Sequence, residues 1–215
     1  MSTLYSYFRS SAAYRVRIAL NLKGLAYETV PVHLVRDGGE QRKPAYRALN
    51  VNGLVPTFVE DGVNLHQSLA IIEYLEEIHP TPALLPADPV ARAQVRALAL
   101  DIAADIHPID NLRVLRYLKH DLGVTDAQKD AWYVHWVMEG FTSLEARLAA
   151  QSSPGRFTFG DTPTLADCCL VPQVYNANRF RVDMTPFPRI AAVTAHCLTL
   201  DAFRRAAPEA QPDAE

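Results

Sequence analysis

Apolar and polar positions at the start of the chain alternate with a period of two and then recur with a helical period. The alternation from Thr3 to Tyr7 predicts a β-strand, and the apolar spacing from about Ala12 to Lys23 predicts a helix with one buried face. Gly24 supplies the stop signal of that helix. Alternation resumes from Tyr27 to Val32, so the chain is predicted to open with a β-α-β unit.

A second pair of predicted strands follows a polar loop. Residues Pro56 to Glu60 and Val63 to His66 flank Asp61-Gly62, which is a strong signal for a tight hairpin. Residues Ser68 to Ile78 then repeat apolar side chains at helical spacing. The order β-α-β, loop, β-β-α is that of a thioredoxin-like α/β domain, which we expect over residues 1–79.

A proline-rich stretch separates this domain from the rest of the chain. Four of the ten residues from 80 to 89 are prolines, a density that no regular element tolerates. We therefore expect a linker over residues 80–89. Asp88 and Pro89 are the N-cap and first-turn residues typical of a helix that starts there.

Helical patterns dominate residues 90–215, which are expected to form an all-helical second domain. One long helix, kinked at Pro108, is predicted from about Ala91 to Lys119. Another is predicted from about Asp126 to Ala150. Thr164 and Asp167 have the spacing of a capping box that opens a further helix.

Composition excludes several classes of protein. The 215 residues carry a formal net charge of −3, which gives no nucleic-acid footprint, and charges interrupt every candidate membrane span. The seven histidines lack metal-binding spacing, so no metal site is predicted. Three clustered cysteines (Cys168, Cys169, Cys197) and an N-terminus without a secretion pattern lead us to expect a cytoplasmic protein, with Cys168 and Cys169 as small core residues.

The chemistry of the chain is concentrated at two predicted helix starts. Ser10 and Ser11 lie where the first strand runs into its helix, and Gln67-Ser68 opens a later one. Amide groups at a helix start are unpaired and the helix dipole is positive there, so such a hydroxyl can hold a thiolate or a carboxylate. Taken alone, the two serines are better explained as simple helix caps, and only Val55-Pro56 and Gln67-Ser68 together reverse that preference.

Together, these features resemble the cytosolic glutathione transferases, and within them the zeta class. The resemblance rests on Ser10-Ser11-Ala12-Ala13 followed by Arg15-Val16-Arg17, on Leu54-Val55-Pro56, on His66-Gln67-Ser68 and on Leu170-Val171-Pro172-Gln173. It spans about Leu4 to Pro208. It implies glutathione as cofactor and a homodimer. One departure is Ala12, which stands where the zeta motif usually has a cysteine.

The resemblance assigns roles to residues of the first domain. Ser10 is expected to stabilise the glutathione thiolate, with Ser11 as a helper or N-cap. Val55 is expected to pair with the cysteinyl backbone of glutathione, next to a Val-Pro bond that is cis in the family. Gln67 and Ser68 are expected to bind the γ-glutamyl carboxylate.

The implied reaction is cis–trans isomerisation of a dicarboxylate by reversible thiolate addition, and it requires cations for two carboxylates and an enolate. Arg9, Arg179 and Arg113 are the candidates, with a solvated surface charge as the alternative for each. His107 and Asn111 could reach glutathione or substrate from the helical domain, although packing explains them equally well.

Three functions compete at this point. The leading one is isomerisation of maleylacetoacetate, with maleylpyruvate as an alternative substrate. A second is general glutathione transfer to electrophiles such as α-halo acids. The third is a glutathione-binding scaffold without turnover, which would have no use for a hydroxyl at the thiol.

Overall fold

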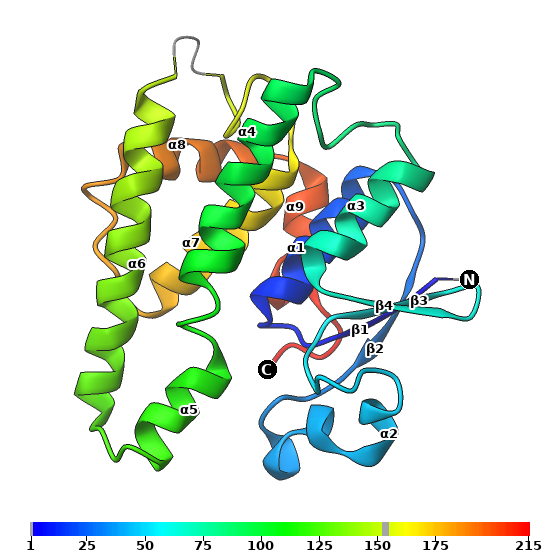
Figure 1. The fold of residues 1–215 in the computed structure, drawn as a ribbon, viewed down its shortest axis with the longest axis vertical. Helices are drawn as coiled ribbons and strands as arrows, with labels where there is room; N and C mark the ends of the chain where they lie inside the picture. Colours follow the sequence, from blue (N-terminus) through cyan, green and yellow to red (C-terminus); the bar gives the residue numbers. More distant parts are fainter. Residues whose placement is uncertain (1, 152–154) are drawn as a thin grey trace. The chain divides into compact units, whose positions relative to one another are not determined.

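The computed structural model describes residues 2–151 and 155–215 (Figure 1). These residues form two compact units. The first contains the chain up to Leu84 together with Leu198–Glu215, and the second contains Leu85–Cys197. The division falls within the expected proline-rich linker, but residues 198–215, which were expected in the helical domain, belong to the first unit.

The first unit is built on a four-stranded sheet in the order β2-β1-β3-β4 (Figure 1). Strand β1 (Thr3–Ser6) pairs in parallel with β2 (Glu28–Pro31) and antiparallel with β3 (Thr57–Glu60), which forms a hairpin with β4 (Val63–His66). The hairpin turn is Asp61-Gly62, and both residues have positive φ, as the sequence predicted. The mixed sheet confirms the thioredoxin-like fold.

Two helices pack together beside this sheet, α1 (Ser11–Leu22) and α3 (Ser68–Ile78). Each helix buries one apolar face. Ile18 on α1 and Leu75 on α3 are both fully buried. A short helix α2 (Pro44–Arg47) and two 3₁₀ turns, η1 (Arg36–Gly38) and η2 (Glu40–Arg42), occupy the segment predicted as a polar loop.

A buried ion pair fixes the end of this domain to the proline-rich stretch. Lys23 Nζ lies 2.7 Å from Glu76 Oε2 and also donates to the carbonyl groups of His79 and Pro82. The Glu76 carboxylate in turn accepts from the amide of Leu84. Because all of these groups are partnered, the start of the linker is held in place without regular structure.

The C-terminal segment returns to the first helix. Helix α9 (Asp201–Ala206), orange-red in Figure 1, packs against α1 and buries Phe203 completely. A 3₁₀ turn η4 (Pro208–Ala210) follows it. An apolar face on α9 thus joins the C-terminal segment to the core of the first unit, which is why the expected boundary at residue 90 does not describe the end of the chain.

The second unit is helical, as predicted. Its elements are α4 (Pro89–Leu100), the π-helix η3 (Asp101–Ile106), α5 (Leu112–His120), α6 (Asp126–Ala149), α7 (Leu165–Arg179) and α8 (Pro188–Cys197). A capping box of Thr164 and Asp167 precedes α7, where the Thr164 amide donates to Asp167 Oδ2 at 2.7 Å. Cys168 and Cys169 are fully buried in α7, in keeping with core positions.

The helix predicted across Pro108 is wrong. The chain widens into the π-helix η3, leaves helical structure at His107 and starts again at Leu112. Proline lacks the amide needed to continue a helix, and here the interruption is complete rather than a kink. In the part of the chain that the structure describes, no helix has both the length and the apolar character to cross a membrane, and no group of three metal-binding side chains comes together.

Candidate functional site

Ser10 is the N-cap of α1. Its backbone is extended (φ −69°, ψ 115°), and its Oγ accepts a hydrogen bond from the Ala13 amide at 3.2 Å. Because this bond uses a lone pair, it fixes the oxygen and leaves the hydroxyl proton available for donation. Ser11 is the first residue within the helix and is buried, so the expectation that it could be the N-cap is wrong.

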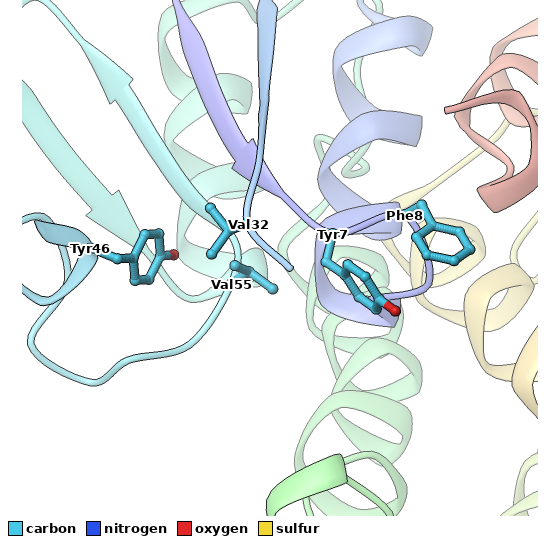
Figure 2. Close-up of a cluster of buried hydrophobic side chains, with 5 residues drawn as sticks. All are labelled: Tyr7, Phe8, Val32, Tyr46 and Val55. Carbon is cyan, nitrogen blue, oxygen red and sulfur yellow. The ribbon is translucent and has the colours of Figure 1, made fainter. Parts of the chain in front are cut away.

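An apolar cluster links the segment before Ser10 to Val55. Tyr7, Phe8, Val32, Tyr46 and Val55 are all buried in this cluster (Figure 2). Val32 and Val55 lie between the rings of Tyr46 and Tyr7 (Figure 2). The segment that precedes Ser10 and the segment that carries Val55 thus pack in the same cluster.

Val55 itself lies before the start of β3, two residues short of the hairpin ladder. The Val55–Pro56 peptide bond is cis, as the family resemblance implied. Tyr46 and Asn50 fix the loop ahead of it, since both side chains donate to the Leu54 carbonyl, at 2.7 and 2.9 Å.

Gln67 and Ser68 form the start of α3, as predicted. Gln67 is exposed and has φ 72° and ψ 113°, a conformation that costs a non-glycine residue free energy. Ser68 follows as the first helical residue and is buried. The unpaired amide groups and the positive end of the dipole at such a helix N-terminus are suited to an anion.

Arg15 supplies a cation that the sequence did not single out as a site residue. The residue is only 2 % exposed, and Nη1 donates to Ser68 Oγ at 3.3 Å. The positive charge therefore lies directly behind the hydroxyl expected to bind a carboxylate. No pattern in the sequence distinguishes Arg15 from the other residues of α1. Its proximity to Ser68 becomes visible only in the contact between α1 and α3.

Arg9 lies in the same turn as Ser10. Its Nη2 donates to the Tyr7 hydroxyl at 3.0 Å, and its guanidinium lies 4.7 Å from the centre of the Phe8 ring. Two aromatic rings thus hold the guanidinium of this candidate cation.

The remaining candidates belong to the second unit. His107 Nε2 and Asn111 Nδ2 are 3.3 Å apart, so the structure brings these two side chains together. Asn111 is the N-cap of α5, and its Oδ1 accepts from the Arg113 amide at 3.1 Å. The Arg113 side chain is exposed.

Arg179 ends α7 and is exposed. Its Nη1 donates to Asn176 Oδ1 at 2.8 Å, and its guanidinium lies 5.4 Å from the centre of the Phe180 ring. Phe180 stacks on the buried Tyr133, with ring centroids 3.6 Å apart. The guanidinium is therefore oriented by one amide oxygen and one ring while its end stays in solvent.

Asp110 is a buried acid that the sequence analysis missed. Only 7 % of the residue is exposed, and neither carboxyl oxygen has a hydrogen-bond partner among the described residues. Burial raises the pKa of this carboxyl to about 8, so Asp110 is mostly protonated at neutral pH.

Comparisons with family models and with known proteins identify the family of the chain. The model for the glutathione S-transferase N-terminal domain matches residues 4–83, and the model for the C-terminal domain matches residues 126–196. A probable maleylacetoacetate isomerase from Vibrio cholerae is 54 % identical over 98 % of this chain and 97 % of its own length. The chain belongs to the glutathione S-transferase family.

Solved structures of other glutathione S-transferases agree in fold. A holo maleylpyruvate isomerase, described as a bacterial zeta-class transferase, is 55 % identical with a TM-score of 0.96, covering 99 % of this chain and 100 % of its own. A maleylacetoacetate isomerase from Methylobacterium extorquens AM1, with bound malonate and glutathione, is 41 % identical with a TM-score of 0.95, covering 99 % of both chains. The zeta-class assignment of this transferase is confirmed.

Proposed function

We propose that this transferase is a glutathione-dependent cis–trans isomerase that converts maleylacetoacetate to fumarylacetoacetate. Maleylpyruvate is the second candidate substrate, because a maleylpyruvate isomerase is as similar in sequence as the maleylacetoacetate isomerases are. The observation that carries the proposal is the fixed Ser10 hydroxyl at the N-terminus of α1, in a chain similar to these isomerases over its whole length.

The residues of the first unit fit glutathione chemically. Ser68 at the start of α3, with Arg15 behind it, is complementary to a carboxylate, and we assign the γ-glutamyl end to Gln67 and Ser68. Val55 lies outside the sheet ladder and is assigned to the cysteinyl backbone. His107 and Asn111 are proposed as further contacts from the second unit.

Ser10 is proposed to stabilise the thiolate. A cysteine thiol has a pKa of about 8.5, and lowering it by two requires about 2.7 kcal/mol. A hydrogen bond to a charged group contributes roughly 1.5–3 kcal/mol, and a helix N-terminus adds about 0.3–2 kcal/mol. One hydroxyl and the first turn of α1 are therefore sufficient in magnitude, with Ser11 as a helper.

When bound, glutathione supplies the nucleophile that converts the substrate C=C bond into a rotatable single bond. The chain's own residues then have to hold two carboxylates and the developing enolate. We assign this task to Arg9, Arg179 and Arg113, whose guanidinium groups bind carboxylates in a bidentate fork.

The test is direct. Purified protein is mixed with glutathione and either maleylacetoacetate or maleylpyruvate, and formation of the fumaryl product is followed. Turnover that requires glutathione supports the proposal. Turnover of an α-halo acid without isomerisation would favour general transfer, and glutathione binding without any turnover would favour a scaffold.

We further propose that the protein is a cytoplasmic homodimer. The three cysteines are buried and form no disulfide, which suits a reducing compartment. Light scattering of the purified protein tests the dimer.

A further inference from the structure

Side chains from two distant parts of the chain hold both backbone groups of Phe8. Arg17 Nη2 donates to the Phe8 carbonyl at 2.9 Å, and the Phe8 amide donates to Asp213 Oδ2 at 3.0 Å. Phe8 lies within the turn that ends at Ser10, since the Ser10 amide donates to the Tyr7 carbonyl at 2.9 Å. A shift of the Phe8 peptide would therefore move Ser10.

Arg17 is completely buried and has several further partners. Its Nη1 donates to Ser6 Oγ at 3.0 Å and its Nε donates to the Ala206 carbonyl at 2.9 Å. Desolvation lowers the pKa of this guanidinium to about 10, so it remains charged at neutral pH. One guanidinium thus ties the end of β1, the Phe8 turn and the C-terminal segment together.

The C-terminal segment has contacts of its own that bring Asp213 to the turn. Gln211 Nε2 donates to the carbonyl groups of Arg205 and Ala207, both at 2.9 Å, and so fixes the turn after α9. Two residues beyond Asp213, the Glu215 carboxylate lies 2.8 Å from Arg36 Nη2. Asp213 is therefore held between two anchored points.

The geometry points to Arg17 and Asp213 as positioning residues that fix the turn carrying Ser10. The inference rests on the proposed role of Ser10 toward the thiolate. Hydrogen bonds weaken steeply as distance and angle depart from their optimum, so a small displacement of Ser10 Oγ would reduce stabilisation of the thiolate. Neither residue needs to touch glutathione for this effect.

Asp213→Ala removes the acceptor for the Phe8 amide, whereas Asp213→Asn retains an acceptor oxygen without the charge. We expect Asp213→Ala to raise the pKa of the glutathione thiol bound to the protein by about 0.5–1, with glutathione affinity within about twofold of wild type. The ultraviolet absorbance of the thiolate, titrated on the glutathione complex, reports this pKa. Asp213→Asn should keep the thiol pKa close to the wild-type value, and Glu209→Gln, at an exposed position of the same segment, is the control and should leave the thiol pKa unchanged.

A double-mutant cycle separates positioning from general stability. If Asp213 acts through Ser10, Asp213→Ala should change the thiol pKa much less in a Ser10→Ala background than in wild type. An equal change in both backgrounds, or an unchanged thiol pKa in Asp213→Ala, would overturn the inference. If Asp213→Ala does not fold, the same measurements are made on Asp213→Glu, which displaces the carboxylate by one methylene.

Arg17→Lys provides a second test. Lysine keeps the positive charge, but it lacks the planar group whose three nitrogens donate hydrogen bonds to Phe8, Ser6 and Ala206. It should raise the thiol pKa in the same direction as Asp213→Ala. Wild-type protein that binds and ionises glutathione without isomerising either substrate would contradict the proposed function, while the thiol titration would still decide the positioning role.

Discussion

Arg15 Nη1 donates to Ser68 Oγ at 3.3 Å, and this contact joins α1 to the first turn of α3 although the two residues lie 53 positions apart in the chain. One lone pair of the Ser68 hydroxyl is used by a buried cation, so the hydroxyl proton remains for an anion. The positive charge, the hydroxyl and the N-terminus of α3 are together complementary to a carboxylate, which supports the proposed γ-glutamyl site.

Ser68→Ala should weaken glutathione binding by about 10- to 150-fold, because a charged end of the ligand loses a hydrogen bond and the bond from Arg15 to Ser68 is lost as well. Gln67→Ala should weaken binding in the same direction. Calorimetry measures both affinities. Unchanged affinity in both variants would exclude this site for the γ-glutamyl end.

The positive φ of Gln67 supplies a matched control. Glycine adopts this conformation without strain, so Gln67→Gly should fold at least as stably as wild type but bind glutathione as weakly as Gln67→Ala. Weaker binding without lower stability would assign the effect to the side chain rather than to a damaged fold.

Ser10→Ala should lower isomerase turnover by about 10- to 100-fold with little change in glutathione affinity, because the lost bond is to the thiolate. The same substitution should lower the free energy of unfolding by about 0.5–2 kcal/mol, because Ser10 is the N-cap of α1. Steady-state kinetics and urea unfolding measure the two effects.

Two further variants separate these roles of Ser10. Ser10→Asp retains the cap but has no proton to donate, so stability should persist while turnover falls. Ser10→Thr retains both the hydroxyl and the cap and should keep most activity. Turnover of Ser10→Ala within twofold of wild type would move the thiolate role to Ser11 or to the backbone.

The first domain was predictable from the sequence because its signals are local. Asp61-Gly62 dictates a hairpin, and Ser10 and Gln67 each stand at a helix start. By contrast, the bonds from Arg15 to Ser68 and from Phe8 to Asp213 join residues 53 and 205 positions apart. No periodic pattern in the sequence marks side chains that act through such contacts, so they are recognised only in the folded structure.

The break at Pro108 was missed for a different reason. Apolar spacing continues on both sides of the proline, and a period alone cannot distinguish a kinked helix from two helices separated by a turn. The buried Asp110 lies in that turn, so the error in the helix also concealed the acid.

Arg179→Lys should raise the KM for the dicarboxylate by about 10-fold while leaving glutathione affinity unchanged, because an ammonium cannot reproduce a bidentate guanidinium–carboxylate contact. Arg181→Lys, at an exposed position two residues further on, is the matched control and should have no effect. An equal loss with a neutral electrophile would show that Arg179 is structural.

The preference between maleylacetoacetate and maleylpyruvate should depend on the position of the cation that binds the second carboxylate of the substrate. Leu112 gives the start of α5 an apolar side chain next to the exposed Arg113, an arrangement that we expect to suit the longer acid. We therefore predict activity on both substrates, with kcat/KM higher for maleylacetoacetate. Side-by-side kinetics at saturating glutathione measure the ratio, and a tenfold preference for maleylpyruvate would contradict this role of Leu112.

Asp110 should make the stability of the protein depend on pH. In the folded protein its carboxyl retains a proton up to about pH 8, whereas the unfolded chain loses it near its ordinary pKa of 3.8. Between these values the folded state binds more protons, so the free energy of unfolding should fall as pH rises, by up to about 1.4 kcal/mol per pH unit. Urea unfolding at pH 5 and pH 8 measures the difference.

Asp110→Asn removes this titration while keeping the shape of the side chain. The free energy of unfolding of the variant should be higher than that of wild type at pH 8. It should also differ much less between pH 5 and pH 8 than the wild-type value does. Asp105→Asn, an exposed acid in the preceding π-helix, should change neither. If Asp110→Asn retains the wild-type pH dependence, the carboxyl is ionised in the folded protein and must have a partner, such as a bound water or cation, that offsets the cost of its burial.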